Sequence, residues 1–320
     1  MKSLLALCLS LPLVADTLIR VEKSDEAMGS TFSVVVYGHD RGELEAAAAA
    51  ALDEAQRLDR LLSNYDTHSE WSRMNREAIV GPVKISSELF HLLSQCLEYS
   101  RQSEGAFDIT VGPLMRVWGF YRGEGQLARG QDVANALRRV GYLYLRLDAA
   151  AQTVRFDRPG MELDPGGIGK GYAVDRMVDV LRRKGVSIAL VSAGGSSIYA
   201  LGAPPEEPQG WRMTIRDPRN PHLSAAEVFL KDASLSTSGV TEKFFRAGQR
   251  KYSHLMDPRT GYPAKGASSV SVIAPQTIDG EAWTKPYFIN GRAWTAAHKQ
   301  KEFRVFFCDD RSGPSCGWVP

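Results

Sequence analysis

The sequence has almost no excess of charge of either sign. Its 320 residues include 39 lysine and arginine residues and 37 aspartate and glutamate residues, which gives a formal net charge of +2. A nucleic-acid-binding surface usually shows as a strong basic excess or a basic stripe. The two densest basic runs, at residues 181–184 and 298–301, are short and are typical of solvated helix faces. We therefore expect no nucleic acid among the partners of this protein.

A long hydrophobic run is also missing. The best candidate, residues 4–14, is much shorter than the roughly 20 residues that a membrane-spanning helix needs. Lys2 before this run and Ala15 after it complete the pattern of a secretory signal peptide. We expect a signal peptide at residues 1–15, an exported protein and no stable membrane span. The alternative is a buried N-terminal segment of a cytoplasmic protein.

Cysteine is scarce, because the chain holds four of these residues. That number excludes a disulfide-dense scaffold. Cys8 lies in the predicted signal peptide, and Cys96 lies in an amphipathic helical pattern that predicts a small core residue. Cys308 and Cys316 lack the paired CxxC spacing of a zinc site, but they could form a disulfide in an oxidising compartment.

Neither of the two common nucleotide-binding motifs is present, although residues 163–175 read LDPGGIGKGYAVD. A P-loop requires G-x-x-x-x-G-K-[ST], but Asp164 fills its first glycine position and Gly171 its hydroxyl position. The dinucleotide motif G-x-G-x-x-G would need its last glycine at Tyr172. The segment still precedes a predicted helix, where glycines let backbone amides approach an anion and Lys170 adds a positive charge. The alternative is a tight turn with a solvated lysine.

The expected elements indicate an α+β fold, because strands and helices are interspersed without a regular βαβ alternation. There is no internal repeat and no low-complexity linker. Hydrophobic periodicity predicts helices at residues 44–62, 87–102, 132–140, 172–184 and 280–287. Strands are expected at residues 31–37, 143–147, 153–156, 188–192, 211–216, 227–230, 268–274 and 304–308, and loops at 63–76 and 203–209.

Two further patches carry candidate chemistry. Asp108 lies among apolar residues, where an ionised carboxylate needs a specific partner; the alternative is a helix-cap or turn aspartate. His254 lies in the segment YSHLMDPRTG and could act as a general acid or base. The alternative for His254 is a hydrogen-bonded structural histidine.

The segment DGEAWTK at residues 279–285 is a candidate metal site. On a helix, Glu281 and Thr284 are three residues apart and share a face. Oxygen ligands of this kind suit Mg²⁺, which takes few protein ligands and keeps waters or phosphate oxygens. The alternative is a first helical turn whose acidic residues complement the helix dipole.

Taken in order, these patches resemble the ApbE-type FAD:protein FMN transferases, the flavin transferases of bacterial envelopes. The resemblance runs from Met28 to Trp294 and therefore covers most of the chain. The motifs that carry it are MGST at 28–31, LSNY at 62–65, GAFD at 105–108, GPL at 112–114, LDPGGIGKGYAVD at 163–175, TSG at 237–239, and His254 with DP at 257–258.

The resemblance implies an activity and a fold. Members of this family use Mg²⁺ to cleave the FAD pyrophosphate and attach the FMN half to a threonine of an acceptor protein, releasing AMP. Some members instead hydrolyse FAD. The family fold is a single α+β unit of two lobes with an FAD cleft between them, which we expect to span residues 16–320. A bacterial cell-envelope location, such as the periplasm, is implied as well.

The resemblance also implies roles for individual residues. His254 matches the histidine that assists proton transfer from the target hydroxyl. The Mg²⁺ ligands would be the backbone carbonyl of Gly167 and the side chains of Glu281 and Thr284. Contacts with FAD are implied for Met28, Tyr65, Ala106, Phe107, Asp108, Asp164, Lys170 and Leu255.

The sequence departs from the family pattern at two places. Where the family has a metal-binding aspartate four residues before the threonine, this chain has Gly280. Glu281 or Asp279 must then substitute, and Glu281 is favoured because it shares a helical face with Thr284. After the TSG motif the family has an acid or amide and a tyrosine, whereas this chain has Val240 and Thr241. The alternatives are therefore a non-catalytic FAD-binding envelope protein, an FAD pyrophosphatase, or an envelope hydrolase of another specificity.

Overall fold

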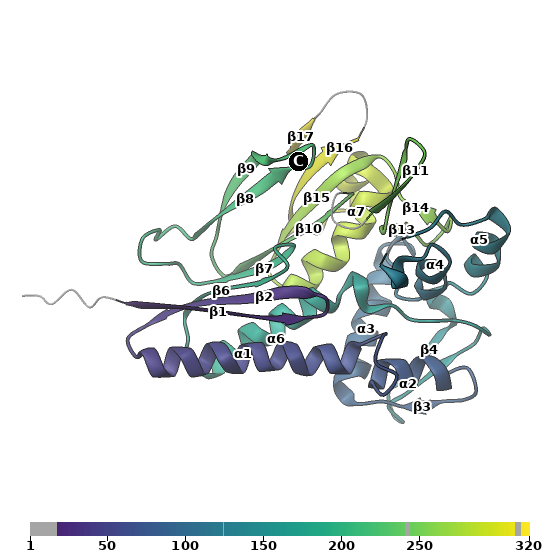
Figure 1. The fold of residues 1–320 in the computed structure, drawn as a ribbon, viewed down its shortest axis with the longest axis horizontal. Coiled ribbons are helices and arrows are strands. Elements are labelled where there is room, and N and C mark those ends of the chain that lie inside the picture. The colour runs from purple at the N-terminus through teal and green to yellow at the C-terminus, as the bar shows by residue number, and fades with distance from the viewer. Residues whose placement is uncertain (1–17, 124, 241–243, 311–314) are drawn as a thin grey trace, which may run out of the picture.

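An eight-stranded antiparallel sheet forms the centre of the protein (Figure 1). The computed structural model describes residues 18–123, 125–240, 244–310 and 315–320, so the predicted signal peptide lies outside the described part. The strands of this sheet, in spatial order, are β1 (Ile19–Ala27), β2 (Ser30–Gly38), β6 (Ile188–Ala193), β7 (Ser197–Leu201), β10 (Ala233–Gly239), β15 (Ala267–Ala274), β16 (Arg304–Asp309) and β17 (Cys316–Trp318).

Three helices cover one face of this sheet, and a β-hairpin covers the other (Figure 1). The helices are α1 (Arg41–Leu62), α6 (Gly169–Arg183) and α7 (Thr277–His298), and the hairpin strands are β8 (Trp211–Asp217) and β9 (Asn220–Leu230). Because side chains alternate along a strand, Val34 and Val36 of β2 pack against the helices while Val35 packs against the hairpin. Both faces of the sheet are therefore buried.

A smaller helical part lies beside the end of the large sheet (Figure 1). Its helices are α2 (Glu70–Glu77), α3 (Ser87–Gln102), α4 (Gly112–Val117) and α5 (Gly130–Leu137), with short 3₁₀ turns η1 (Phe120–Arg122), η2 (Tyr142–Tyr144) and η3 (Pro165–Gly167). The small strands are β3 (Val83–Lys84), β4 (Leu145–Asp148), β5 (Thr153–Phe156), β11 (Phe244–Ala247), β12 (Arg250–Ser253), β13 (Met256–Asp257) and β14 (Tyr262–Pro263). One hydrophobic cluster joins this part to the sheet, since Trp71 and Leu92 belong to the same core as Val270 and Tyr287.

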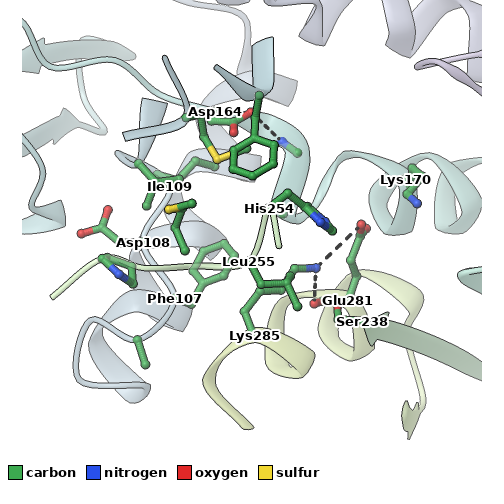
Figure 2. A pocket seen from close by; sticks show the side chains of 18 of the residues that line it. Phe107, Asp108, Ile109, Asp164, Lys170, Ser238, His254, Leu255, Glu281 and Lys285 are labelled. Carbon is green, nitrogen blue, oxygen red and sulfur yellow. Dashed lines mark hydrogen bonds and ion pairs between the residues drawn. The ribbon is translucent and has the colours of Figure 1, made fainter. Parts of the chain in front are cut away.

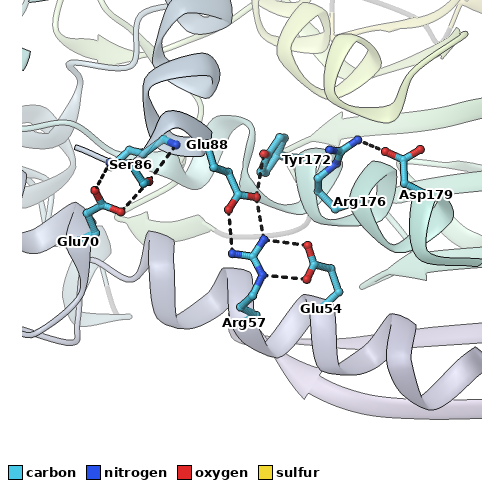
Figure 3. Close-up of polar contacts among 9 residues, drawn as sticks. Glu54, Arg57, Glu70, Ser86, Glu88, Tyr172, Arg176 and Asp179 are labelled. Atoms are coloured by element: carbon cyan, nitrogen blue, oxygen red, sulfur yellow. Dashed lines mark hydrogen bonds and ion pairs between the residues drawn. The ribbon is translucent and has the colours of Figure 1, made fainter. Parts of the chain in front are cut away.

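An ion-pair network ties α1, α3 and α6 together (Figure 3). The guanidinium of Arg57 lies between two carboxylates, 2.7 Å from Glu88 and 2.8 Å from Glu54. The hydroxyl of Tyr172 on α6 donates to the same Glu88 carboxylate at 3.1 Å. Hydrogen bonding to Arg57 lowers the pKa of Glu88 from its usual value. The start of α6 is thereby fixed relative to the two neighbouring helices.

Most of the expected elements are present, and the α+β class is confirmed. The loop prediction for residues 63–76 is wrong from Glu70 onward, where α2 begins behind the N-cap Ser69. The expected strand at 143–147 begins at Leu145, because residues 142–144 form a 3₁₀ turn. The helix expected from Tyr172 begins at Gly169, so the end of the glycine-rich segment is itself the first turn of α6.

The cysteine predictions are confirmed for the described residues. Cys308 and Cys316 form a disulfide between β16 and β17, and Cys96 is fully buried in α3. None of the described helices combines the length and the apolar composition that crossing a membrane requires.

Candidate functional site

One cavity lies between the helical part and the helix-covered end of the large sheet, and it brings most of the predicted site residues together (Figure 2). Met28 and Thr284 are the two predicted residues that do not line it. Those that do are Tyr65, Ala106, Phe107, Asp108, Asp164, Gly167, Lys170, His254, Leu255 and Glu281. Segments separated by more than two hundred positions in the sequence therefore form one site.

The glycine-rich segment is held rigidly at the cavity edge. The Asp164 carboxylate accepts a hydrogen bond from the backbone N–H of Gly166 at 3.0 Å and one from the Asn64 side chain at 3.3 Å. On the preceding residue, the carbonyl of Leu163 accepts from the side chains of Trp71 and Asn75 at 3.1 and 3.0 Å. Helix α2 thus anchors the loop, a role for Trp71 that the sequence did not reveal because its segment was expected to be irregular.

Lys170 places a positive charge at the cavity, on the first turn of α6 (Figure 2). Its ammonium donates to the hydroxyl of Ser196, which lies in the turn between β6 and β7. That turn contains Gly194 and Gly195 at φ values of 57° and 70°, a left-handed backbone that glycine adopts without strain. The helix N-terminus and the lysine together favour an anionic ligand.

Glu281 faces the cavity from α7 and is only 4% exposed. Its Oε2 accepts a hydrogen bond from the backbone N–H of Gly171 in the first turn of α6, where negative charge complements the helix dipole. The ammonium of Lys285, one turn further along α7, lies 3.9 Å from Oε1 and donates to the Glu281 carbonyl at 2.8 Å (Figure 2). Glu281 therefore bridges the N-terminus of α6 and a lysine that sequence reasoning did not single out.

The structure separates Glu281 from the other candidate acid, Asp279. The Asp279 carboxylate accepts a hydrogen bond from the Tyr99 hydroxyl at 2.6 Å and lies in a different hollow, beside α3. Burial raises the pKa of Asp279, although the bond from Tyr99 opposes that rise. Of the two, Glu281 alone faces the cavity.

Thr284 is not placed at the cavity wall, contrary to the expected ligand set. Its side chain is 0% exposed, its hydroxyl donates to the Glu281 carbonyl at 2.6 Å, and the same oxygen lies 2.8 Å from the hydroxyl of Ser238. Ser238 belongs to the TSG motif on β10, so this contact fixes α7 against the sheet. A three-residue spacing did predict a shared face with Glu281, but the Thr284 hydroxyl turns back to the helix backbone.

The residues present do not fit a protein-held Mg²⁺ as they are arranged. Gly280, at the position of the family's metal-binding aspartate, packs on β10: a Cβ there would lie 3.0 Å from the Ser236 hydroxyl. The Lys285 ammonium accompanies the Glu281 carboxylate, and the Thr284 hydroxyl has two partners. Within the described ranges, no three or more histidine, cysteine, aspartate or glutamate side chains form a cluster of metal-binding type.

Aromatic and apolar side chains also line the cavity. Tyr65 is 74% exposed, and its ring meets the edge of Tyr121 at a centroid distance of 6.4 Å. Phe107 is buried beside Gly167, where an added Cβ would lie 3.4 Å from its ring. Phe120 and Tyr121 line the cavity as well, but they were not predicted as site residues, because a short aromatic pair shows no periodicity. These rings suit stacking with a planar heterocycle.

Asp108 lines the cavity, but its carboxylate accepts hydrogen bonds from nearby backbone groups. It accepts hydrogen bonds from the N–H and hydroxyl of Thr110 at 2.8 and 2.7 Å and from the N–H of Tyr142 at 2.8 Å. Burial raises the pKa of Asp108, and these three hydrogen bonds act in the opposite direction. The structure thus favours the turn-aspartate alternative for the side chain of Asp108.

His254 and Leu255 reach the cavity from the segment between β12 and β13. The imidazole of His254 lies edge-on to Phe120, with ring centroids 6.4 Å apart. Leu255 is buried, and its carbonyl accepts from the N–H of Ala264 at 2.7 Å. Met28 lies nearby in the β1–β2 turn, where its sulfur would be 3.8 Å from a Cβ on Gly169.

The relatives found by comparison with known proteins share one description. The chain is 30% identical to an FAD:protein FMN transferase of Klebsiella pneumoniae strain 342, over 86% of this chain and 84% of the relative. It is also 30% identical to an FAD:protein FMN transferase of Treponema pallidum strain Nichols, over 84% of this chain and 78% of the relative.

Solved structures show the same fold. The crystal structure of the ApbE protein of Thermotoga maritima superposes with a TM-score of 0.86 at 26% identity, covering 93% of this chain and 97% of that one. The flavinyl transferase ApbE of Pseudomonas stutzeri in its apo form gives a TM-score of 0.82 at 26% identity, covering 94% and 95%. Because the sequence model of the ApbE family also matches residues 28–307, this chain belongs to the ApbE family.

Proposed function

We propose that this protein is an FAD:protein FMN transferase, which moves the FMN half of FAD to a threonine of an acceptor protein and releases AMP. The observation that carries the proposal is that this cavity combines cationic groups with aromatic side chains. Lys170, Lys285 and the N-terminus of α6 supply the positive charge, and Tyr65 and Tyr121 supply aromatic rings. A flavin nucleotide has the matching pair of features, a pyrophosphate and a planar ring system.

The reaction exchanges the phosphoanhydride bond of FAD for a phosphoester bond to the acceptor. The acceptor hydroxyl oxygen forms a bond to the phosphorus of the FMN half, and the pyrophosphate P–O bond to the AMP half breaks, so that AMP leaves with the bonding electrons. The proton of the acceptor hydroxyl goes to His254, which lines the same cavity. In phosphoryl transfer, positioning and neutralisation of charge supply most of the catalysis. The cationic groups of the cavity provide these two contributions.

Magnesium is implied by the resemblance to the family, but the arrangement of Gly167, Glu281 and Thr284 does not fit the ion. In the proposed reaction, side chains of the protein supply the positive charge at the pyrophosphate. Glu281 orients the start of α6 and the Lys285 ammonium, and Lys170 and Lys285 face the pyrophosphate.

We also propose that the protein is exported and acts in the bacterial cell envelope, as the periplasmic members of the family do. Two observations support this location. The sequence of residues 1–15, outside the described part, has the pattern of a signal peptide. Cys308 and Cys316 form a disulfide, and such bonds persist in oxidising compartments.

The test of the transferase activity is incubation of the purified protein with FAD and a threonine-bearing acceptor protein. We expect AMP in solution and flavin fluorescence that stays with the denatured acceptor on a gel. AMP and free FMN without labelled acceptor would make the protein an FAD pyrophosphatase. Tight FAD binding without AMP under any condition would make it a non-catalytic flavin-binding protein.

A further inference from the structure

The Lys285 side chain lies where the family resemblance expects a metal ion. Its Cε would be 3.8 Å from a Cβ on Gly167, and its ammonium is 3.9 Å from Oε1 of Glu281. Gly167 and Glu281 are two of the three expected metal ligands. The side chain is 17% exposed and lines the cavity (Figure 2).

The contacts of Glu281 hold this lysine in position. Four residues apart on α7, the two side chains lie on one helical face, and the Lys285 ammonium also donates to the Glu281 carbonyl at 2.8 Å. The other carboxylate oxygen of Glu281 is bonded to the N–H of Gly171. Lys285 is thus fixed relative to both α7 and the start of α6, where the pyrophosphate is expected.

A second cation would be unfavourable at this place. Mg²⁺ demands near-octahedral oxygen ligands, and it usually takes one or two carboxylates that are free to bind it. Here Glu281 is the acidic side chain among the expected metal ligands, and its Oε1 already lies 3.9 Å from the Lys285 ammonium. The resemblance expects the family's aspartate at the position of Gly280, which packs closely on β10: a Cβ there would lie 3.0 Å from the Ser236 hydroxyl.

We propose that the ammonium of Lys285, held by Glu281, takes the place of Mg²⁺ against the FAD pyrophosphate, so that FAD binding and cleavage in this protein do not require a divalent metal. The inference rests on the proposed function, since it concerns the same site. A lysine ammonium has three donors and acts on phosphate as a point charge. Lys285 takes no part in the proton transfer, because the acceptor proton goes to His254.

The test compares wild type, Lys285→Met, Lys285→Arg and the control Lys301→Met in EDTA and in MgCl₂. Lys301 is exposed and lies beyond the end of α7. FAD affinity is read from the quenching of flavin fluorescence, and cleavage from released AMP. We expect wild type and the control to bind and cleave FAD equally well in EDTA and in MgCl₂.

Lys285→Met removes the charge but keeps the length of the side chain. We expect its cleavage rate in EDTA to fall by about 100-fold, the loss typical of one electrostatic contact to a developing charge. Added MgCl₂ should restore part of both affinity and rate, because Glu281 then lacks its lysine. Lys285→Arg keeps a cation, so its FAD binding and cleavage should not depend on metal. That result would also show that the position tolerates substitution.

The inference would be wrong if wild type bound FAD only in MgCl₂ and Lys285→Met behaved in the same way. The proposed transferase function would still hold in that case. No binding of FAD by wild type in either buffer would overturn both. The binding titration decides between these outcomes even where no acceptor is turned over.

Discussion

The backbone N–H of Gly171, at the start of α6, donates to the carboxylate of Glu281, which is 110 positions away on α7. The two helices can approach this closely because residue 171 has no side chain. A Cβ on Gly171 would lie 2.7 Å from Oε2 of Glu281 and 2.8 Å from the carbonyl of Thr277. The glycine that breaks the P-loop pattern is thus required by packing between helices and not by phosphate.

Substitution Gly171→Ala should therefore destabilise the protein. The added methyl group must push α6 away from α7, and overpacking of this kind usually costs about 1–3 kcal/mol in the free energy of unfolding. Urea unfolding followed by circular dichroism measures the change. Gly81→Ala is the matched control, because a Cβ there meets nothing within 4 Å; we expect it to change the free energy by less than about 0.5 kcal/mol. Equal stability of the two variants would contradict the close approach of the helices.

Glu281 and Asp279 should respond differently to loss of charge. Glu281→Gln removes the negative charge that holds Lys285, so we expect FAD cleavage to fall by about 100-fold. Asp279→Asn keeps an oxygen that can accept from Tyr99 and lies outside the cavity, so cleavage should be unchanged. The measurement is the initial rate of AMP release at saturating FAD. If Asp279→Asn were the inactive variant, the assignment of Glu281 to the site would be wrong.

The sequence predicted which residues share the cavity better than it predicted what they do there. Ordered motifs identify Lys170, His254 and Glu281 because each lies in a short conspicuous segment. The partner of each side chain is set by tertiary packing, which spacing along one helix does not encode. Thr284 shares a face with Glu281, yet its hydroxyl bonds to Ser238 of β10 and to its own helix.

The missed helix α2 has a similar physical explanation. Its eight residues are mostly polar, and Trp71, Ser72 and Met74 are its buried positions. So few apolar residues give no helical period that a sequence window can recognise. The helix is stabilised instead by the Ser69 cap and by the hydrogen bond from Trp71 to the Leu163 carbonyl, which is known only once the fold is known.

Asp175 should make stability depend on pH. Burial raises its pKa to about 6 from 3.8, although the N–H groups of Thr277 and Ile278 at the start of α7 donate to its carboxylate. Because the folded-state pKa lies above the unfolded value, the stabilisation is present below about pH 4 and is lost as the pH rises through 6. The variant Asp175→Asn does not titrate and serves as the reference. Relative to this variant, the free energy of unfolding of wild type should fall by about 1–2 kcal/mol between pH 4 and pH 7, after allowance for partial exposure. If the difference in free energy of unfolding between wild type and the variant stayed constant or grew with pH, the carboxylate would be ionised throughout.

The Cys308–Cys316 disulfide should stabilise the edge of the large sheet. It closes a loop with a sequence separation of 8 between β16 and β17, for which chain entropy predicts roughly 2–3 kcal/mol. Thermal unfolding with and without dithiothreitol should show a lower midpoint under reducing conditions. The double variant Cys308→Ser/Cys316→Ser should have that lower midpoint in both buffers. If the unfolding midpoint of wild type were the same with and without dithiothreitol, the result would argue against this disulfide.

His254 should affect transfer far more than binding. His254 is the proposed general base that accepts the proton of the acceptor hydroxyl, so His254→Gln should slow covalent labelling of the acceptor by about 10²–10⁴-fold. The cations at the pyrophosphate, Lys170 and Lys285, remain in this variant, and FAD affinity from fluorescence quenching should therefore change little. His222→Gln, an exposed site on β9, is the control for loss of a histidine. Equal losses of affinity and labelling would make His254 a binding residue, and unchanged labelling would remove it from the mechanism.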